Sequence, residues 1–214
     1  MIPQTRWAAA ARHIRRMNAP RRGLSSSGDP APAPTPAIRR FWRAVSVGER
    51  DGHHVVLLDK RPIKTPDGCL VRIAQQQRAL AWLVAAEWEA QKEVLSTHSL
   101  PLTSLVSRAI DGLSDPAARG DVIDKLLKYF QTDSVCLHEE FPHVLVELQQ
   151  QHYTPILAWA RSTYGVDIQT TTDLFALRQS PQAVAVLRGA VAAFSPLKLA
   201  ALERATMSAK SLLI

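Results

Sequence analysis

The sequence predicts an α+β protein in which a small N-terminal β-sheet domain is followed by a larger, mostly α-helical domain. Two observations carry this prediction. Between residues 40 and 74, apolar residues alternate with polar ones in short runs that turn dipeptides separate. After Gln75 the apolar period becomes helical, and capping residues followed by proline mark several helix starts. We therefore expect a β domain over residues 39–75 and an α-helical domain over residues 76–214.

The first 28 residues have a composition of their own, with six arginines, no lysine and no acidic residue. A segment rich in arginine and serine and poor in acid is typical of a mitochondrial transit peptide. Arg22 suits a cleavage after Leu24, so we expect a transit peptide over residues 1–24 and import into the mitochondrial matrix. A disordered basic arm is the alternative. Residues 25–38, rich in proline, serine and alanine, are expected to form a disordered linker.

The formal net charge of +7 resides mostly in that basic segment, because the rest of the chain holds 20 basic and 19 acidic residues. A folded basic face for nucleic acid is therefore not expected. Cys69 and Cys136 form no metal-binding pair, and we expect both to be buried. No stretch approaches the roughly 18 apolar residues of a membrane span.

The β domain is predicted in this order: a strand from Phe41 to Val47, a hairpin turn at Asp51-Gly52, a return strand over 53–58, turns at 61–62 and 65–68, and a strand over 70–73. Asp-Gly between two apolar runs is a strong hairpin signal. So small a sheet cannot bury a large core alone, and we expect it to pack on the helices that follow.

The first helix is predicted to carry one apolar stripe through Leu80, Leu83, Val84, Glu87, Trp88 and Gln91. A second helix covers about 102–113, and a third is capped by residues 114–116. A fourth, over 143–164, should bury Leu145, Leu148, His152, Ile156 and Trp159 and should be kinked or divided at Pro155. Gly165 is its predicted C-cap, and Ser180-Pro181 and Ser195-Pro196 open two further helices.

The sequence stops at Ser211-Leu212-Leu213-Ile214, within an apolar run. Chain ends are usually polar and frayed. Either the α-helical domain is truncated here, which is our expectation, or this last turn docks on the fold.

Glu87 is the main candidate for chemistry, because it lies on an apolar stripe and a buried lone carboxylate is costly. It could be a general acid or base. Alternatively, it could form a structural salt bridge to a basic residue such as Lys64 or Arg108, or lie at the edge of the stripe and reach water. No second catalytic group stands at a fixed spacing from it, which favours the structural role. His138 and His143 are five residues apart with Pro142 between them, so they do not form the zinc-binding helix motif. No phosphate loop is present, and we expect no catalytic residue, metal or cofactor.

Tryptophan and aspartate positions supply further candidates. Trp82 lies off the stripe of the first helix and is the best surface candidate among the tryptophans, although core packing is the expectation for each of them. Asp111 lies off the stripe of its helix and Asp133 follows a helix end. Solvent exposure or capping is expected for both aspartates.

Three segments together resemble one known family: Leu58-Asp59-Lys60-Arg61-Pro62-Ile63-Lys64-Thr65-Pro66, Ala85-Ala86-Glu87-Trp88-Glu89-Ala90-Gln91 and Leu100-Pro101-Leu102-Thr103. Residues 129–133 and 149–165 continue the likeness, with Tyr153-Thr154-Pro155 where the family has Trp-Asp-Pro. In order and spacing these segments resemble the mitochondrial F1-ATPase assembly chaperones.

The resemblance implies a matrix chaperone that binds the unassembled α subunit of ATP synthase and prevents its aggregation until it joins the β subunit. It implies no hydrolysis of nucleotide, and we expect the free protein to be monomeric. A small matrix enzyme using Glu87 as acid or base, or a nucleic-acid-binding module, is the alternative. The candidate partner-binding residues are Glu87, Trp82, Trp88, Lys64, Asp111 and Asp133.

Overall fold

The structure, a computed structural model, describes residues 38–173 and 175–214. The described residues form two compact units that divide between Gly112 and Leu113. The division expected at residues 75 and 76 follows the change from strand to helix, whereas the contacts keep the first two helices with the sheet. The expected transit peptide and nearly all of the expected linker lie outside the described residues.

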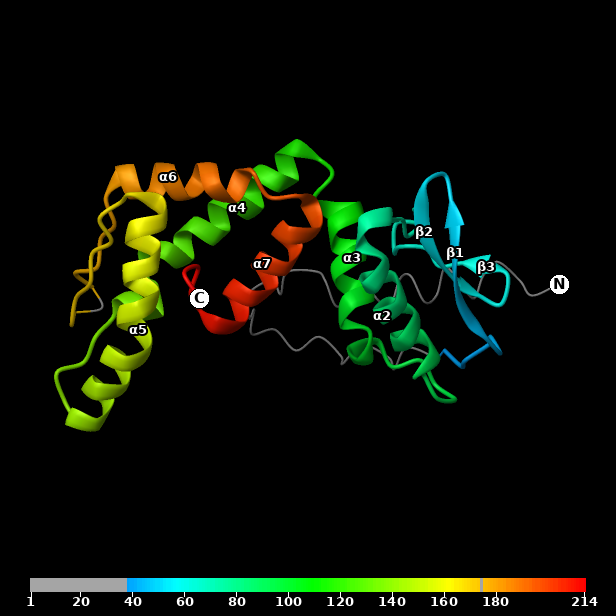
Figure 1. Ribbon diagram of the computed structural model, residues 1–214, viewed down its shortest axis with the longest axis horizontal. Helices are drawn as coiled ribbons and strands as arrows, with labels where there is room; N and C mark the ends of the chain where they lie inside the picture. Colours follow the sequence, from blue (N-terminus) through cyan, green and yellow to red (C-terminus); the bar gives the residue numbers. More distant parts are fainter. Residues whose placement is uncertain (1–37, 174) are drawn as a thin grey trace, which may run out of the picture. The chain divides into compact units, whose positions relative to one another are not determined.

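The first unit contains an antiparallel sheet built around one hairpin (Figure 1). Strand β1 (Val45–Arg50) pairs with β2 (His53–Leu58) along its whole length. Strands β3 (Arg61–Pro62) and β4 (Ile73–Ala74) pair with opposite ends of β2. The α+β class predicted from the sequence is confirmed, because six α-helices, α2 to α7, follow these four strands in the described part of the chain.

The hairpin turn is the one that the sequence predicts. Arg50 pairs with His53, which leaves Asp51 and Gly52 as a two-residue turn. Both have positive φ, 50° and 71°, as the type I′ turn of a tight hairpin requires. The local preference of Asp-Gly for this conformation therefore sets the register of the sheet.

Three details of the predicted sheet are wrong. The first strand, predicted from Phe41 to Val47, begins only at Val45 and continues to Arg50. Arg61-Pro62 forms strand β3 rather than a turn, and the chain reverses one step earlier, where Asp59 has a φ of 57°. The Asp59 carboxylate holds this corner by accepting the backbone N–H groups of Arg43 and Ala44. These two hydrogen bonds, helped by the charges of Arg43 and Arg40, lower the pKa of Asp59. The last strand is also shorter than predicted, since Leu70 makes only an isolated bridge to Lys64.

Helices α2 (Arg78–Glu89) and α3 (Pro101–Gly112) complete the first unit. Helix α2 packs on β1 and β2, and α3 lies beside α2 (Figure 1). The buried residues of α2 are Ala81, Val84, Ala85 and Trp88. Leu83 was expected on this stripe but is 55% exposed, because the covered face of α2 runs through Ala81, Val84, Ala85 and Trp88 instead.

The second unit is helical. Helix α4 (Pro116–Gln131) packs against α6 (Pro181–Ala192) and α7 (Pro196–Ala209). Each begins at proline, and the side chain before it accepts hydrogen bonds from backbone N–H groups of the first turn. These caps, all predicted, are Asp115, Ser180 and Ser195.

Helix α5 (His143–Tyr164) runs without interruption to Gly165, which has the left-handed φ of 62° expected for its C-cap. Of the kink or division predicted at Pro155, the division is wrong, since proline costs this helix a hydrogen bond without ending it. The predicted buried face is wrong as well. Leu145, Leu148 and Trp159 are 37%, 46% and 52% exposed.

Both cysteines were expected to be buried, but only one of them is. Cys136 is buried beside helix α5, whereas Cys69 is exposed in the turn that follows Thr65. Burial, followed by the nearby charge of Asp133, raises the pKa of Cys136 to about 12. That thiol therefore stays protonated and unreactive at neutral pH.

Candidate partner-binding site

The segments 85–91 and 100–103 meet where α2 ends and α3 begins. Helix α3 starts at Pro101 after Leu100, whose side chain has no acceptor to cap the helix. Glu87 of α2 supplies the acceptor instead. Its Oε1 accepts the backbone N–H of Leu102 at 2.6 Å, and its Oε2 accepts that of Thr103 at 2.9 Å. The Thr103 hydroxyl also donates to Oε2, at 2.8 Å.

Glu87 therefore caps helix α3 from another helix. A carboxylate is favourable at this position because the N-terminus of a helix carries unsatisfied N–H groups and a partial positive charge. A structural role for Glu87 was one of the expectations. Its partners, however, are backbone and hydroxyl groups of α3, where Lys64 or Arg108 was expected.

Trp88 and Thr103 extend the same cluster. The indole Nε1 of Trp88 donates to Thr103 Oγ1 at 3.1 Å, so that Thr103 links the indole to the Glu87 carboxylate. Trp88 is 2% exposed, and its ring lies 5.3 Å from that of Trp42 in an edge-on arrangement. This pair forms the aromatic centre of the first unit.

Gln91 orders the connection between α2 and α3. Its side chain is buried, and its Nε2 donates to the Glu87 carbonyl at 2.9 Å and to Ser99 Oγ at 2.7 Å. Its Oε1 accepts the backbone N–H of Ser96 at 2.8 Å. From the sequence, Gln91 was expected only on an apolar stripe, and no role was expected for Thr103. A glutamine and a threonine on otherwise apolar helix faces were the signal for this network.

Trp82 and Leu83 lie on the outer side of α2, where they are 51% and 55% exposed. The surface position considered for Trp82 is correct, and the core packing expected for it is wrong. Ala79 and Ala86 are exposed next to them at helical spacing, which gives α2 an outward apolar stripe. Contact of Trp82 with a partner remains a prediction.

Lys64 and Asp111 lie at the turn formed by residues 65–68. Lys64 is exposed, and its backbone pairs with Leu70. Asp111 Oδ2 accepts the backbone N–H of Asp67 at 3.2 Å, so it attaches this turn to α3. Partner contact stays a prediction for both residues.

Asp133 belongs to the second unit and is completely buried, so the solvated position considered for it is wrong. Its Oδ1 accepts the N–H of Val135, capping the short helix η3 (Ser134–Cys136). Its Oδ2 accepts the N–H groups of Leu212 and Leu213 at 2.7 and 3.3 Å. The residues around 211–213 are buried through these bonds, which is the docked arrangement considered for this segment.

Asp133 should give the stability of the second unit a distinct pH dependence. Burial raises the pKa of its carboxyl, although hydrogen bonds from Ser211 and from three backbone N–H groups oppose the shift. A raised pKa means that the folded state binds the proton more tightly than the unfolded state. The ordinary pKa of an aspartate carboxyl is about 4. As the pH rises from that value through the raised pKa of the folded state, the contribution of Asp133 to the free energy of unfolding should therefore fall.

The comparison of wild type with Asp133→Asn isolates this contribution, because asparagine does not titrate. Urea unfolding followed by circular dichroism at stepped pH should show the stability advantage of wild type decreasing as the pH rises. Asp121→Asn makes the same chemical change at an exposed position on α4 and is the matched control. A difference between wild type and Asp133→Asn that rises with pH would contradict the assignment.

The candidates thus fall into separate groups. Glu87 and Trp88 share one cluster, Trp82 lies on the opposite face of the same helix, Lys64 and Asp111 lie at the turn of 65–68, and Asp133 lies in the other unit. In the described residues, no group of three or more His, Cys, Asp or Glu side chains could hold a metal ion. Nor is any helix of this part long and apolar enough to cross a membrane.

Glu87, the main candidate for a catalytic acid or base, binds backbone N–H groups of the chain's own helix α3. Large apolar side chains, by contrast, face outward on α2 and α5. This arrangement is typical of a protein that acts by binding other proteins. Residues 39–161 match the family model described as ATP12 chaperone protein. The chain therefore belongs to the ATP12 family of F1-ATPase assembly chaperones.

Two curated relatives are fungal. The mitochondrial protein atp12 of Schizosaccharomyces pombe is 28% identical over 192 residues, which cover 86% of this chain and 66% of the relative. The mitochondrial protein ATP12 of Saccharomyces cerevisiae is 31% identical over 203 residues, covering 81% and 62%. The chain thus spans slightly less than two thirds of the length of these relatives.

Solved bacterial structures share the fold. Atp12 from Paracoccus denitrificans is 30% identical, with a TM-score of 0.71 over 82% of this chain and 73% of that one. Atu1473 from Agrobacterium tumefaciens, a putative chaperone, is 28% identical, with a TM-score of 0.75 over 86% and 71%.

Proposed function

We propose that the protein is a mitochondrial assembly chaperone of F1 ATP synthase that acts in the matrix. In this role it binds the unassembled α subunit, keeps it from aggregating and releases it when the β subunit arrives. The observation that carries the proposal is the family match over residues 39–161, which includes the motif residues that join α2 to α3. The mitochondrial names of the fungal relatives support the compartment.

The physical basis is competition for one apolar surface. A subunit that normally lies beside another exposes apolar area when alone, and such area drives aggregation. A chaperone that covers this area stabilises the subunit by mass action and leaves when the natural neighbour binds more tightly. The outward apolar side chains of α2 and α5 supply surface of the required kind. No nucleotide needs to be hydrolysed in such an exchange.

The two alternatives make different demands. An acid–base enzyme would need Glu87 to be free for a substrate, whereas both of its oxygens accept hydrogen bonds from α3. A nucleic-acid-binding module would need an excess of basic residues in the fold, whereas the chain after residue 28 carries 20 basic and 19 acidic residues. Both arguments favour a chaperone that is not an enzyme.

Co-expression with the F1 α subunit in the absence of β tests the proposal. We expect α to remain soluble and to co-purify with this protein as a complex of one copy of each. Added β subunit should displace the protein, and β expressed in place of α should not be retained. If α precipitates as it does alone, or if β does not compete, the proposed function is wrong.

A further inference from the structure

Helix α5 has two apolar faces, of which only one is covered in the second unit. On the inner face, Leu157 and Ala160 are buried, and the Tyr153 ring lies 6.2 Å from that of His138. Gln149, on the same side, binds the backbone of Leu137 and Glu139. A helix that is apolar on both sides is normally packed on both sides, so we expect a binding partner to cover the outer face.

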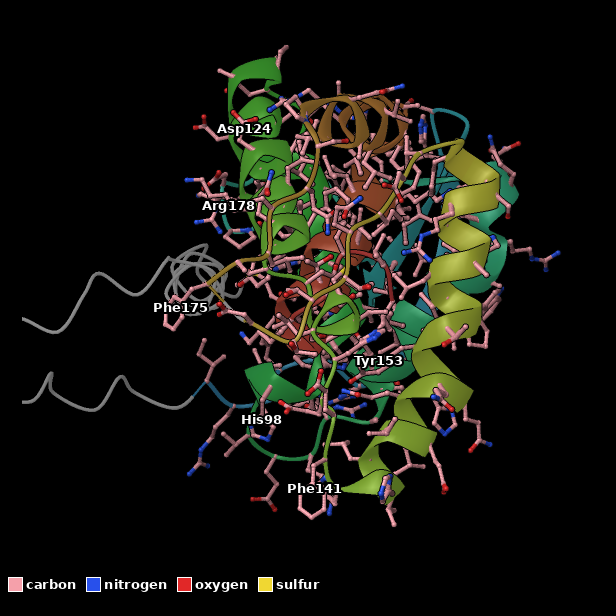
Figure 2. The ribbon with its side chains drawn as sticks, turned by 90° about the vertical axis from the view of Figure 1, so that its left-hand side faces the viewer. His98, Asp124, Phe141, Tyr153, Phe175 and Arg178 are labelled. Carbon is pink, nitrogen blue, oxygen red and sulfur yellow. The ribbon has the colours of Figure 1, made fainter. Side chains whose placement is uncertain are left out.

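The outer face begins in the loop before α5. Phe141 is 77% exposed and Val144 is 67% exposed, and Leu145, Leu148 and Trp159 continue the face along the helix. Figure 2 shows Phe141 at the N-terminal end of α5, pointing away from the helix. We call the set formed by Phe141, Val144, Leu145, Leu148 and Trp159 the outer face of α5.

The spacing along this face is that of a helix-binding seam. Within α5, positions 145, 148, 152, 155 and 159 are separated alternately by three and four residues. This is the a/d repeat by which one helix packs along another. From Leu145 to Trp159 the seam runs for about 21 Å along the helix axis, long enough to hold a partner helix of about four turns. In the N-terminal half of the seam both positions, Leu145 and Leu148, are apolar, and the exposed side chain of Val144 lies beside them in the sequence.

Acidic side chains flank that N-terminal half. Glu139 and Glu140 precede α5 and Glu147 lies within its first turns, all three exposed. None of the ion pairs within the described residues involves them. A partner that brings lysine or arginine beside its apolar stripe would therefore complement this end in charge.

A second copy of this chain would not supply those cations. Parallel pairing of two α5 helices would place the three glutamates of one copy beside those of the other. Antiparallel pairing would place Arg161 of one copy near the three glutamates of the other, but the Arg161 guanidinium already binds the backbone carbonyl of Ile168. The charges thus favour a different protein over self-association.

We propose that the outer face of α5 binds a helix of the client subunit, one with an apolar stripe flanked by lysine or arginine where it meets Glu139, Glu140 and Glu147. This inference rests on the proposed function, because the client is the F1 α subunit named there. To the proposed function it adds the surface that binds the client, the helical structure of the bound client segment and the positive sign of the charge on that segment.

The double variant Val144→Asp/Leu148→Asp tests the apolar part. Both side chains point outward, so the fold should persist, and an unchanged circular dichroism spectrum and thermal melt would verify this. Co-purification of α subunit should fall about 10-fold or more, as for the central residues of an interface. Met207→Asp, at a 53% exposed position on α7, is the matched control and should retain α like wild type.

Charge reversal tests the acidic flank. Glu139→Lys/Glu140→Lys/Glu147→Lys should slow association with α subunit at low ionic strength and reduce the dependence of that rate on salt. The corresponding glutamine variants should show a smaller effect of the same sign. An association rate for the lysine variant that equals wild type at low salt would overturn the charge assignment.

Failure of this inference can be separated from failure of the proposed function. If wild type keeps α soluble and the folded Val144→Asp/Leu148→Asp variant does so equally well, the client binds elsewhere and the inference is wrong. If wild type does not bind α at all, both proposals fall. If light scattering shows a wild-type dimer that the double variant converts to a monomer, the outer face is a contact between copies, which also overturns the inference.

Discussion

Trp88→Ala is expected to lower the free energy of unfolding of the first unit by about 3–5 kcal/mol, the usual cost of removing a buried tryptophan side chain. The substitution would leave a cavity against Trp42, whose ring lies 5.3 Å from that of Trp88. It would also remove the donor that binds Thr103 Oγ1. Urea or thermal unfolding of the whole chain would measure the loss, and a lower amount of soluble protein in cells should accompany it.

Two further variants locate the cause. Trp82→Ala makes the same substitution on the exposed side of α2 and should change stability by no more than about 0.5 kcal/mol. Trp88→Phe keeps most of the ring but loses the indole N–H, so its cost should lie between the two. Equal losses for Trp88→Ala and Trp82→Ala would show that burial in the aromatic centre is not the reason.

Glu87→Gln is expected to destabilise the first unit by about 2 kcal/mol, although it hardly changes the volume of the side chain. The carboxylate accepts three hydrogen bonds from the start of α3. An amide offers one acceptor oxygen and turns an NH2 group toward donors, so at least one N–H group of α3 loses its partner. The negative charge at the helix N-terminus is lost as well.

Glu93→Gln is the control for this second prediction, because Glu93 is exposed beyond the end of α2 and undergoes the same chemical change. Its stability should equal that of wild type. The comparison also separates the two roles considered for Glu87. If Glu87→Gln unfolds like wild type but binds the α subunit more weakly, Glu87 contacts the client and its capping role is energetically minor.

Several elements could be predicted from sequence because their causes are local. Asp51-Gly52 adopts positive φ without help from the rest of the fold, and it places β1 against β2. Asp115, Ser180 and Ser195 cap helices by binding N–H groups two or three residues ahead. The family could be recognised as well, because the order and spacing of its segments are properties of the sequence.

The tertiary structure alone decided which face of each helix is covered. Both α2 and α5 carry apolar residues around more than half of their circumference, so periodicity could not choose between Trp88 and Leu83 or between Leu157 and Leu148. The choice depends on what packs against each helix. In α2 the side that carries Val84 and Trp88 is covered, and in α5 the loop around Leu137 binds the inner side.

The roles of the part-buried Glu87 and of the buried Asp133 were also beyond the sequence. Glu87 meets donors 15 and 16 residues away, and Asp133 meets donors 79 and 80 residues away. Hydrogen bonds are short and directional, so a partner can be assigned only when the fold has brought the two groups together. The sequence by itself determined the α+β class, the local turns and caps, and the family. Only the tertiary structure decided that Glu87 caps α3, that Asp133 binds residues 212 and 213, and that Val144, Leu148 and Trp159 of α5 are exposed. Each of these outcomes depends on contacts between segments distant in the chain.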